Sequence, residues 1–541
     1  MQKLLAVEGS SVDGFGWSVS LSGNTALIGA AFDDENGLGA GSAFVFIRTG
    51  TTWTQQAKLL PPDGGQGYNF GYSVSLSGDT ALIGEPYDAQ NGCNAGSAYV
   101  FIRTGTTWIQ QAKILPSDGA AGDNFGNAVS LEGDTALIGS LSDDDNGFIS
   151  GSAYVFTRTG TTWTQQTKIL AADGAPYTRF GCAVSLDGDT ALIGAYWGDG
   201  AEIDSGSSYV FIRNGTTWVQ EAKLLASDGA VDDLFGFAVS LDGDTALVGA
   251  YADDDSGAYS GSAYVFTRTG TTWEQRYKLL ASDGATFDFF GYSVALLGTT
   301  AFIGAMQNIG NGQYSGSTYV FNRTLETWMQ QAKLVASDGG PGDCFGCSVS
   351  LDSHTALIGA FWDDDNGNDS GSAYVFITEN EPPVADFSWA PQNPSINQQI
   401  TFDASASHDP DGEILVWQWN FGDGASALGE TITHVYLLTG FYNVTLTVVD
   451  DRDAEDVITK EIMVEPVPFN AVFAGLITDL NDTGGDVMSF KAKCVFFVIL
   501  DPFEIGRVIP DEEIWVSSEY QGYLGQKVIL GIFKVVSTEY P

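Results

Sequence analysis

Short apolar runs alternate with glycine-rich polar turns along the first two thirds of the chain. In the second copy of this pattern the runs cover residues 72–76, 80–83, 97–102 and 108–115. Runs of five to eight residues between tight turns predict four strands of an antiparallel sheet. The third run is apolar at successive positions, so we expect that strand to be buried on both faces between neighbouring sheets.

The same unit recurs seven times at a fixed interval of 55 residues. Each copy has a Phe-Gly pair at the start of its first strand and a Gly-Ser pair before its third. The first pairs begin at Phe15, Phe70, Phe125, Phe180, Phe235, Phe290 and Phe345, and the second at Gly41, Gly96, Gly151, Gly206, Gly261, Gly316 and Gly371. A period of this length indicates a repeat architecture, and seven four-stranded sheets predict a β-propeller over residues 1–380.

The two ends of the repeat region are complementary. The seventh unit has no fourth strand after residues 374–377, whereas residues 3–9 align with the end of the other fourth strands. Because an open stack would leave unpaired edges, we expect the N-terminal strand to complete the last sheet and close the ring. The Trp that opens the other fourth strands would fall before Met1, and no signal peptide is present. We therefore expect an upstream segment, such as an export signal.

Two regions follow a linker at residues 379–383. Residues 384–466 alternate apolar and polar positions around the motif Trp-Gln-Trp-Asn-Phe-Gly-Asp-Gly at 417–424, which predicts a β-sandwich with Trp419 in its core and Gly422 and Gly424 in a turn. Residues 467–541 predict a small β domain of no recognised family, with strands near 472–478, 489–500, 513–517 and 527–536.

These motifs resemble two known families. The Phe-Gly copies with their Leu-Ile-Gly-Ala strands resemble the FG-GAP repeats of the integrin α-subunit propeller and its microbial relatives, and the motif at 417–424 is similar to that of the PKD domain. The resemblance implies an all-β chain of the kind found in prokaryotic cell-surface proteins: a seven-bladed propeller, an Ig-like PKD sandwich and a small β domain. Integrin-type units carry an Asp-x-Asp-x-Asp-Gly calcium loop between their first two strands. Here a minimal turn such as residues 77–80 replaces it, so those calcium sites are not carried over.

Charge excludes one class of partner. The chain has 68 acidic and 22 basic residues, a net charge of −46, and nucleic-acid binding needs a basic surface. Thirteen of the 22 basic residues occupy only two repeat positions, those of Arg48 and Lys58, so we expect them to pair with acidic neighbours. No apolar stretch reaches the length of a membrane span, so no transmembrane segment is expected.

The loops between second and third strands carry most of the variation. They share one face with the connections between sheets, and they contain acidic runs in which carboxylates and amides could ligate calcium. The candidate calcium ligands are Asp33, Asp34, Glu35, Asp143, Asp144, Asp145, Asp253, Asp254, Asp255, Asp363, Asp364 and Asp365. The EF-hand spacing is missing. The alternative is a solvated, turn-forming loop, because Asp, Asn and Gly are common in turns.

Aromatic residues adjoin these acidic runs. Aromatic rings beside carboxylates suit a carbohydrate ligand, whose apolar ring faces stack while its hydroxyls form hydrogen bonds. The candidate ligand-binding residues are Phe32, Tyr87, Trp197, Tyr251 and Trp362. The alternative is that these rings cover the ends of the blades.

Near-perfect repetition argues against catalysis, because an active site needs each group once. Unique residues occur at 177–179, Glu202, 276–277, 307–314 and His354. The three histidines are isolated, so the sequence predicts no Ser–His–Asp or histidine metal site and no enzyme. We interpret Cys182, Cys344 and Cys347 as buried thiols rather than zinc ligands.

Together these features predict an extracellular or cell-surface binding or adhesion protein. Its propeller face would recognise a glycan or a protein, with calcium as a candidate cofactor. Two alternatives stay open: a purely structural envelope component, and a polysaccharide-cleaving enzyme with a PKD accessory module.

Overall fold

The structure is a computed structural model. It describes residues 1–466 except 325–326, 354, 378–381, 411–412 and 451–453, and beyond residue 466 it describes only the backbone of five strands. The chain divides into two compact units, Met1–Glu379 and Asn380–Pro541. The predicted boundary at residue 467 lies within the second unit and stays a prediction. His354 lies outside the described residues.

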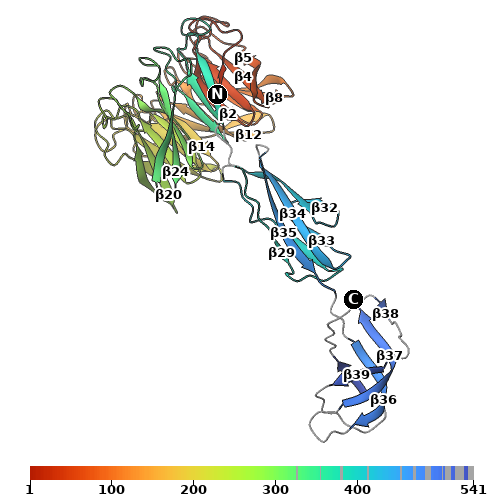
Figure 1. The fold of residues 1–541 in the computed structure, drawn as a ribbon. Helices are drawn as coiled ribbons and strands as arrows, with labels where there is room; N and C mark the ends of the chain where they lie inside the picture. The colour runs from red at the N-terminus through yellow and green to blue at the C-terminus, as the bar shows by residue number, and fades with distance from the viewer. Residues whose placement is uncertain are drawn as a thin grey trace. The chain divides into compact units, whose positions relative to one another are not determined.

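The first unit consists of seven antiparallel four-stranded sheets (Figure 1). Sheet 1 contains β2 (Phe15–Ser22), β3 (Thr25–Ala30), β4 (Ser42–Thr49) and β5 (Thr52–Leu59); sheet 2 contains β6 (Ser73–Ser77), β7 (Thr80–Glu85), β8 (Ser97–Thr104) and β9 (Thr107–Ile114). Sheet 3 contains β10 (Phe125–Glu132), β11 (Thr135–Ser140), β12 (Ser152–Thr159) and β13 (Thr162–Ile169); sheet 4 contains β14 (Val184–Asp187), β15 (Thr190–Ala195), β16 (Ser207–Asn214) and β17 (Thr217–Leu224). Sheet 5 contains β18 (Ala238–Asp242), β19 (Thr245–Ala250), β20 (Ser262–Thr269) and β21 (Thr272–Leu279); sheet 6 contains β22 (Phe290–Leu297), β23 (Thr300–Ala305), β24 (Ser317–Thr324) and β25 (Thr327–Leu334).

The seventh sheet is built from both ends of the unit. It contains β26 (Val349–Asp352), β27 (Thr355–Ala360) and β28 (Ser372–Ile377), and β1 (Gln2–Leu4) pairs with the free edge of β28. Lys3 lies opposite Tyr374 in this pairing. The predicted pairing of the N-terminal strand with the last unit is confirmed.

Neighbouring sheets approach one another backbone to backbone at the repeated glycines. Gly41 of sheet 1 forms a parallel bridge with Phe70 of sheet 2, and the same bridge recurs at each junction, including that between Gly371 and Phe15. Gly41 has a φ of +84°, and a Cβ on it would overlap the carbonyl oxygen of Phe70. Only glycine combines this φ with so close an approach, so the Gly-Ser and Phe-Gly pairs are structural.

The cores lie between the sheets. The third strand of each sheet is buried over its first residues, as in β8, where residues 97–101 are all buried. Phe70 is fully buried against Tyr99, with ring centroids 5.4 Å apart. The predicted burial of this strand on both faces is confirmed.

The PKD region is a sandwich of two sheets (Figure 1). One contains β29 (Ser388–Ala390), β30 (Gln399–Asp403) and β33 (Thr431–Val435); the other contains β32 (Ser426–Leu428), β31 (Ile414–Asn420), β34 (Gly440–Asp450) and β35 (Glu455–Val464). Trp419 is fully buried and donates from Nε1 to the Gly429 carbonyl at 2.8 Å. Gly422 and Gly424 both have positive φ in the following turn. The predicted roles of these three residues are confirmed.

Five strands are described beyond residue 466: β36 (Ala471–Asn481), β37 (Ser489–Asp501), β38 (Glu504–Ile505), β39 (Glu513–Ser517) and β40 (Ile529–Phe533). They form one sheet in which β37 pairs with β36, β38 and β39, and β36 also pairs with β40. Four of them overlap the strands that the sequence predicts here.

Candidate ligand-binding face

One face of the propeller carries the loops between second and third strands and the connections between sheets, residues 31–41 and 60–72 in the first unit. We call it the loop face, and the opposite side, with the tight turns, the turn end. At the loop face a lysine from the outermost strand of each sheet contacts carboxylates: two or three in five sheets, and one each for Lys223 and Lys333 among the described residues. Lys168 Nζ lies 2.7 Å from Asp143, 2.6 Å from Asp145 and 3.0 Å from Asp118. The hydroxyl of Tyr154 donates to Asp143 and to Asp118, at 3.0 Å each.

This centre repeats around the propeller. The lysines are Lys3, Lys58, Lys113, Lys168, Lys223, Lys278 and Lys333. At the turn end, arginines at the Arg48 position pair with carboxylates in the same regular manner. The prediction that these basic residues pair with acidic neighbours is confirmed for the seven lysines and for Arg103, Arg158, Arg213 and Arg268. Arg48 instead donates to the amide oxygen of Asn24.

The lysine ammonium groups contact the carboxylate oxygens that we considered as calcium ligands. In each acidic run the first carboxylate, such as Asp33, is buried, and it contacts the lysine together with the third, such as Glu35. The second carboxylate instead accepts a backbone amide of its own loop, as Asp34 does from Gly39 N at 2.7 Å. Asp143, Asp145, Asp253, Asp255, Asp363 and Asp365 take the lysine-bound roles, and Asp144, Asp254 and Asp364 the amide-bound role.

Within the described part of the chain, no group of three or more His, Cys, Asp or Glu residues is arranged to hold a metal ion. One lysine ammonium contacts the first and third carboxylates of each acidic run at 2.5–2.9 Å. The arrangement therefore fits a lysine-centred ion pair, and calcium stays a prediction.

The lysine-centred contacts shift pKa values on both partners. Burial lowers the pKa of Lys168, but hydrogen bonds with Asp143, Asp145, Tyr154 and Asp118 outweigh it and raise the pKa above the ordinary lysine value. For Asp118, burial raises the pKa, but the contact with Lys168 outweighs burial and brings the pKa below the ordinary carboxyl value. Both groups are therefore charged at neutral pH, which ties the outer strand to the loop.

The predicted aromatic residues divide into packed and open rings. Phe32 packs on Trp17 at 5.1 Å, Tyr87 on Tyr72 at 6.1 Å, and Tyr251 on Phe237 at 4.5 Å. These three rings pack on residues that directly follow the Phe-Gly pairs, near the starts of the first strands, so they cover the blade ends.

Trp197 and Trp362 differ from these packed rings. The Arg179 guanidinium lies 4.1 Å over the Trp197 ring and donates to the Tyr196 hydroxyl at 2.7 Å. Trp362 is 47% exposed and contacts Phe361 at 4.8 Å. Of the five predicted ligand residues, Trp362 is the ring most available to a ligand.

The structure brings further aromatic residues to the loop face that the sequence reasoning did not select. Phe148 and Tyr177 pair across the junction of sheets 3 and 4, with centroids 5.5 Å apart. Tyr259 and Phe287 stack in parallel at the junction of sheets 5 and 6, with ring centroids 5.6 Å apart. All four rings are exposed. The available signal was variation at these repeat positions, and Tyr177 already lies in the break at 177–179.

A pocket of about 480 Å³ lies beside the stacked pair. It is formed by the connection into sheet 6 and by the loop after β23, and its lining includes Phe287, Asp288, Gln307, Asn311, Gln313 and Tyr314. Asp288 accepts Asn308 Nδ2 at 2.7 Å, and burial raises the pKa of its carboxyl. The pocket coincides with the predicted break in the repeat at residues 307–314, and its lining combines aromatic, amide and carboxyl groups.

The cysteines are free thiols where the structure describes their side chains. Cys344 and Cys347 are buried in an apolar cluster with Phe361. Cys182 lies 3.4 Å from the Gly236 carbonyl. Burial raises the pKa of all three thiols above the ordinary value. The interpretation as buried thiols is confirmed for Cys344 and Cys347, whereas Cys182 is half-buried.

These features define the class of protein as a β-propeller of FG-GAP repeats joined to a PKD domain. The chain belongs to the FG-GAP repeat family, whose repeat matches residues 1–46, 53–101, 108–156, 163–211, 218–266, 273–321 and 328–376. Residues 380–465 match the PKD domain. Both resemblances drawn from the sequence are confirmed.

Curated relatives match only in part. Collagenase ColA of Clostridium perfringens is 38% identical over 78 residues, 14% of this chain and 7% of that protein. Collagenase ColQ1 of Bacillus cereus is 36% identical over 166 residues, 27% and 16%. Pre-pro-metalloprotease PrtV of Vibrio cholerae is 38% identical over 88 residues, 16% and 9%. The chain thus spans a small part of these relatives, in PKD-type regions.

Among solved structures, the PKD1 domain of Vibrio anguillarum Epp is 33% identical, covering 16% of this chain and 99% of that chain, with a TM-score of 0.15. No helix among the described residues is both long and apolar enough to cross a membrane.

Proposed function

We propose that this chain is an extracellular or cell-surface binding protein whose loop face recognises a glycan or a surface protein. The observation that carries the proposal is the set of exposed aromatic and aliphatic side chains on that face. Phe287, Ile309 and Tyr314 line the pocket, and Tyr259 stacks on Phe287. The exposed residues are Val12, Leu38, Phe148, Tyr177, Ile203, Val231, Tyr259, Phe287, Ile309, Tyr314 and Trp362.

The chemistry of the face favours recognition over catalysis. The first carboxylates of its acidic runs are paired with lysines, and buried Asp288, which lines the pocket, accepts the amides of Ala285 and Asn308. The unique polar groups near the pocket are mainly amides, such as Gln307, Asn311 and Gln313. Amides and aromatic rings together bind sugar hydroxyls and sugar faces without providing a general acid or base. A lysine ammonium takes the place of a cation between the first and third carboxylates of each acidic run, and we propose that binding does not depend on calcium.

The PKD domain suggests where such a protein acts. PKD-type regions occur in the collagenases and the metalloprotease that match this chain. Collagen is an extracellular substrate of enzymes so named, which supports an extracellular location and makes collagen one protein ligand to test. A calcium-independent adhesin on an extracellular matrix or cell wall follows from these features.

The full chain should be screened on a glycan array and against collagen, with and without a chelator. We expect binding that survives the chelator and falls at least about tenfold in the double variant Tyr259→Ala/Phe287→Ala, because exposed aromatic anchors dominate such contacts. Ile109→Ala/Val219→Ala removes equally exposed side chains from outer strands and is the matched control. Absence of binding to every probe, or binding that the loop-face variant leaves unchanged, would overturn the proposal.

A further inference from the structure

The turn end carries a repeated clasp between neighbouring blades. In sheet 2, Arg103 Nε donates to Asp79 at 2.6 Å and its Nη1 donates to Thr25 of sheet 1 at 3.1 Å. The guanidinium lies 5.7 Å from the Trp108 ring centroid, and the indole Nε1 donates to Gln56 of sheet 1 at 3.0 Å. Each donor of the clasp therefore has an acceptor.

The clasp recurs in sheets 3, 4 and 5 with the same partners. The position of Asp79 is occupied by Asp134, Asp189 and Asp244, and the position of Gln56 by Gln111, Gln166 and Glu221. These four copies are an internal reference for the junction between sheets 5 and 6.

Two substitutions at that junction remove both acceptors. Thr299 stands where the other blades have the aspartate, and Arg276 stands where they have Gln or Glu. Among the residues that the structure describes, which exclude 325–326 of the adjacent turn, Arg323 forms no ion pair. Trp328, only 7% exposed, has a buried Nε1 without a hydrogen-bond partner. An unpaired buried donor costs about 1–3 kcal/mol, so an acceptor bound here would stabilise the arrangement of the described residues.

Trp53 provides a useful contrast. Its Nε1 also lacks a partner, because the equivalent acceptor position falls at Met1. Arg48 beside it nevertheless keeps an acceptor, donating to Asn24 at 2.7 Å, and lies 5.8 Å from the Trp53 ring centroid. Only at the junction of sheets 5 and 6, within the described residues, do an unpaired arginine and an unpaired indole donor coincide.

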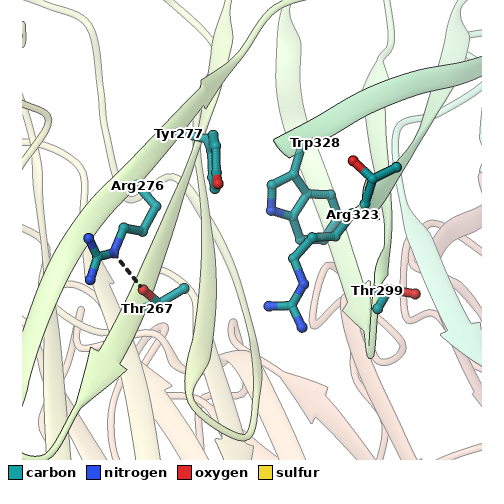
Figure 2. Close-up of a pocket in the computed structure, with 7 residues that line it drawn as sticks. Thr267, Arg276, Tyr277, Thr299, Arg323 and Trp328 are labelled. Carbon is teal, nitrogen blue, oxygen red and sulfur yellow. Dashed lines mark hydrogen bonds between the residues drawn. The ribbon is translucent and has the colours of Figure 1, made fainter. Parts of the chain in front are cut away.

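A cleft of about 520 Å³ opens at this place (Figure 2). Arg276 and Tyr277 line it from β21, and Arg323 and Trp328 line it from β24 and β25. Arg276 donates to Thr267 Oγ1 at 3.0 Å and pairs with Glu274 at 2.8 Å. At the preceding junction, Glu221 and Asp244 both lie near one arginine, Arg268. At this junction their positions are occupied by Arg276 and Thr299, so both carboxylates are replaced.

We infer that this cleft binds an oxyanionic group, a carboxylate or a sulfate carried by an acidic saccharide. Arg323 and the indole N–H of Trp328 would donate to the oxyanion, and a guanidinium fork matches such groups in geometry. The ring of Tyr277 lies beside them as a wall for the sugar. The volume is that of a small-ligand pocket. The cleft lies at the turn end, so this inference does not rest on the proposed function of the loop face.

Calorimetric titration of the full chain with glucuronate, glucose 6-sulfate and neutral glucose tests the inference. We expect glucuronate or glucose 6-sulfate to bind one to one, and glucose not to bind. Whichever anion binds identifies the oxyanion. Arg323→Gln should weaken binding at least about tenfold, because it removes the charge that pairs with the oxyanion.

Thr299→Asp is the decisive second variant. Aspartate occupies this position in four other blades, so the variant should fold, supply Arg323 with its missing carboxylate and abolish anion binding. Arg213→Gln, in the intact clasp of sheet 4, is the matched control and should leave binding unchanged. Tyr259→Ala/Phe287→Ala should also leave it unchanged, which separates this cleft from the loop face. Absence of binding of both anions at 10 mM (an order-of-magnitude ceiling for a useful site), or binding insensitive to Thr299→Asp, would overturn the inference.

Discussion

The two ends of the propeller strands both carry cations, but in different surroundings. At the loop face Lys168 contacts Asp143, whose side chain is 4% exposed. At the turn end Arg158 contacts Asp134, whose side chain is 67% exposed. A buried pair must be complete or it leaves an uncompensated charge, whereas an exposed pair is weak and replaceable.

This difference explains where the repeat tolerates change. The loop-face lysine is kept in all seven blades, even where Gly198 or Asn308 replaces the buried aspartate. At the turn end one whole set of acceptors has been lost at Thr299 and Arg276, and the blade still has its four strands. The loop-face centres therefore hold the architecture, while the turn-end clasps are free to acquire a ligand.

Of the changes that test this difference between the two ends, removal of the N-terminal strand should have the largest effect on stability. Deleting residues 1–9 removes β1 and the loop-face cation Lys3, which contacts Asp338, Asp363 and Asp365. We expect a drop in the thermal midpoint worth several kcal/mol, since a buried strand edge and three carboxylates lose their partners. Lys3→Gln should reproduce only part of the loss in differential scanning calorimetry. An unchanged midpoint in the deletion would contradict the structural role of β1.

Adding a methyl group at a junction between blades should have the next largest effect on the free energy of unfolding. Gly151 has a φ of +79°, and a Cβ there would overlap the Phe180 carbonyl oxygen. Gly151→Ala should lower the free energy of unfolding by well over the ~1 kcal/mol of backbone strain alone. Gly160→Ala is the control in the same sheet: its φ is +63°, but a Cβ would meet no atom within 4 Å. Equal denaturant midpoints for the two variants would rule out close packing as the reason for the glycine.

Breaking a loop-face centre should cost about 3–5 kcal/mol, because Lys168→Gln leaves Asp143, Asp145 and Asp118 without a cation. Lys333→Gln is the matched control. Lys333 has one ion pair, with Asp283, and Asn308 stands at the buried position, so its loss should cost about 1 kcal/mol or less.

The same variant tests the calcium prediction. We expect calcium and chelator to leave the thermal midpoint of the wild-type protein unchanged and calcium to restore part of the stability of Lys168→Gln, because the freed carboxylates can then take a hard cation. A wild-type midpoint that rises with calcium would instead support calcium binding at the acidic runs.

Much of this architecture could be predicted from the sequence, because a 55-residue period constrains every blade at once. The strands, the role of β1 and the pairing of the two basic positions all followed from it. The ligands of the acidic runs did not. Lys168 lies 23 residues beyond Asp145, and only the register of β12 with β13, which sets Lys168 opposite Tyr154, brings its ammonium to that loop.

Ring exposure was equally inaccessible from the sequence. Tyr251 and Trp362 adjoin similar acidic runs, yet Tyr251 turns inward onto Phe237 and Trp362 stays open. Neighbouring blades decide this orientation, and a single repeat does not contain that information. The breaks in the repeat were a better guide, since both pockets lie on breaks identified from the sequence, at residues 276–277 and 307–314.

Removing the carboxyl group of Glu85, at the loop-face end of β7, should stabilise the protein. Glu85 is fully buried beside Asp88, and burial raises its pKa to about 8. The contribution of this carboxyl group to the free energy of unfolding is fully present below its pKa in the unfolded chain, near 4.5. It is lost as pH rises towards 8, at about 1.4 kcal/mol per pH unit, because only the unfolded chain releases the proton in that range. Glu85→Ala should fit, since five other blades have alanine there. It should raise the free energy of unfolding on the order of 3 kcal/mol at pH 7 and by little at pH 4.5. An equal gain at both pH values would exclude titration as the cause.

The smallest effect should come from an intact turn-end clasp. Arg158→Gln removes the contact with Asp134 and the donation to Thr80 Oγ1 at 3.2 Å, but it exposes no buried charge, because Asp134 lies in solvent. We expect a loss of about 1 kcal/mol or less, reduced further at high salt. Lys168→Gln, in the same sheet, should keep most of its effect at high salt, because its carboxylates are partly shielded from the solvent. Urea titrations of both variants at low and high salt measure the difference. If Arg158→Gln proved as costly as Lys168→Gln, the turn-end clasps would be structural after all, and the loss of one at Thr299 would need compensation elsewhere in sheet 6.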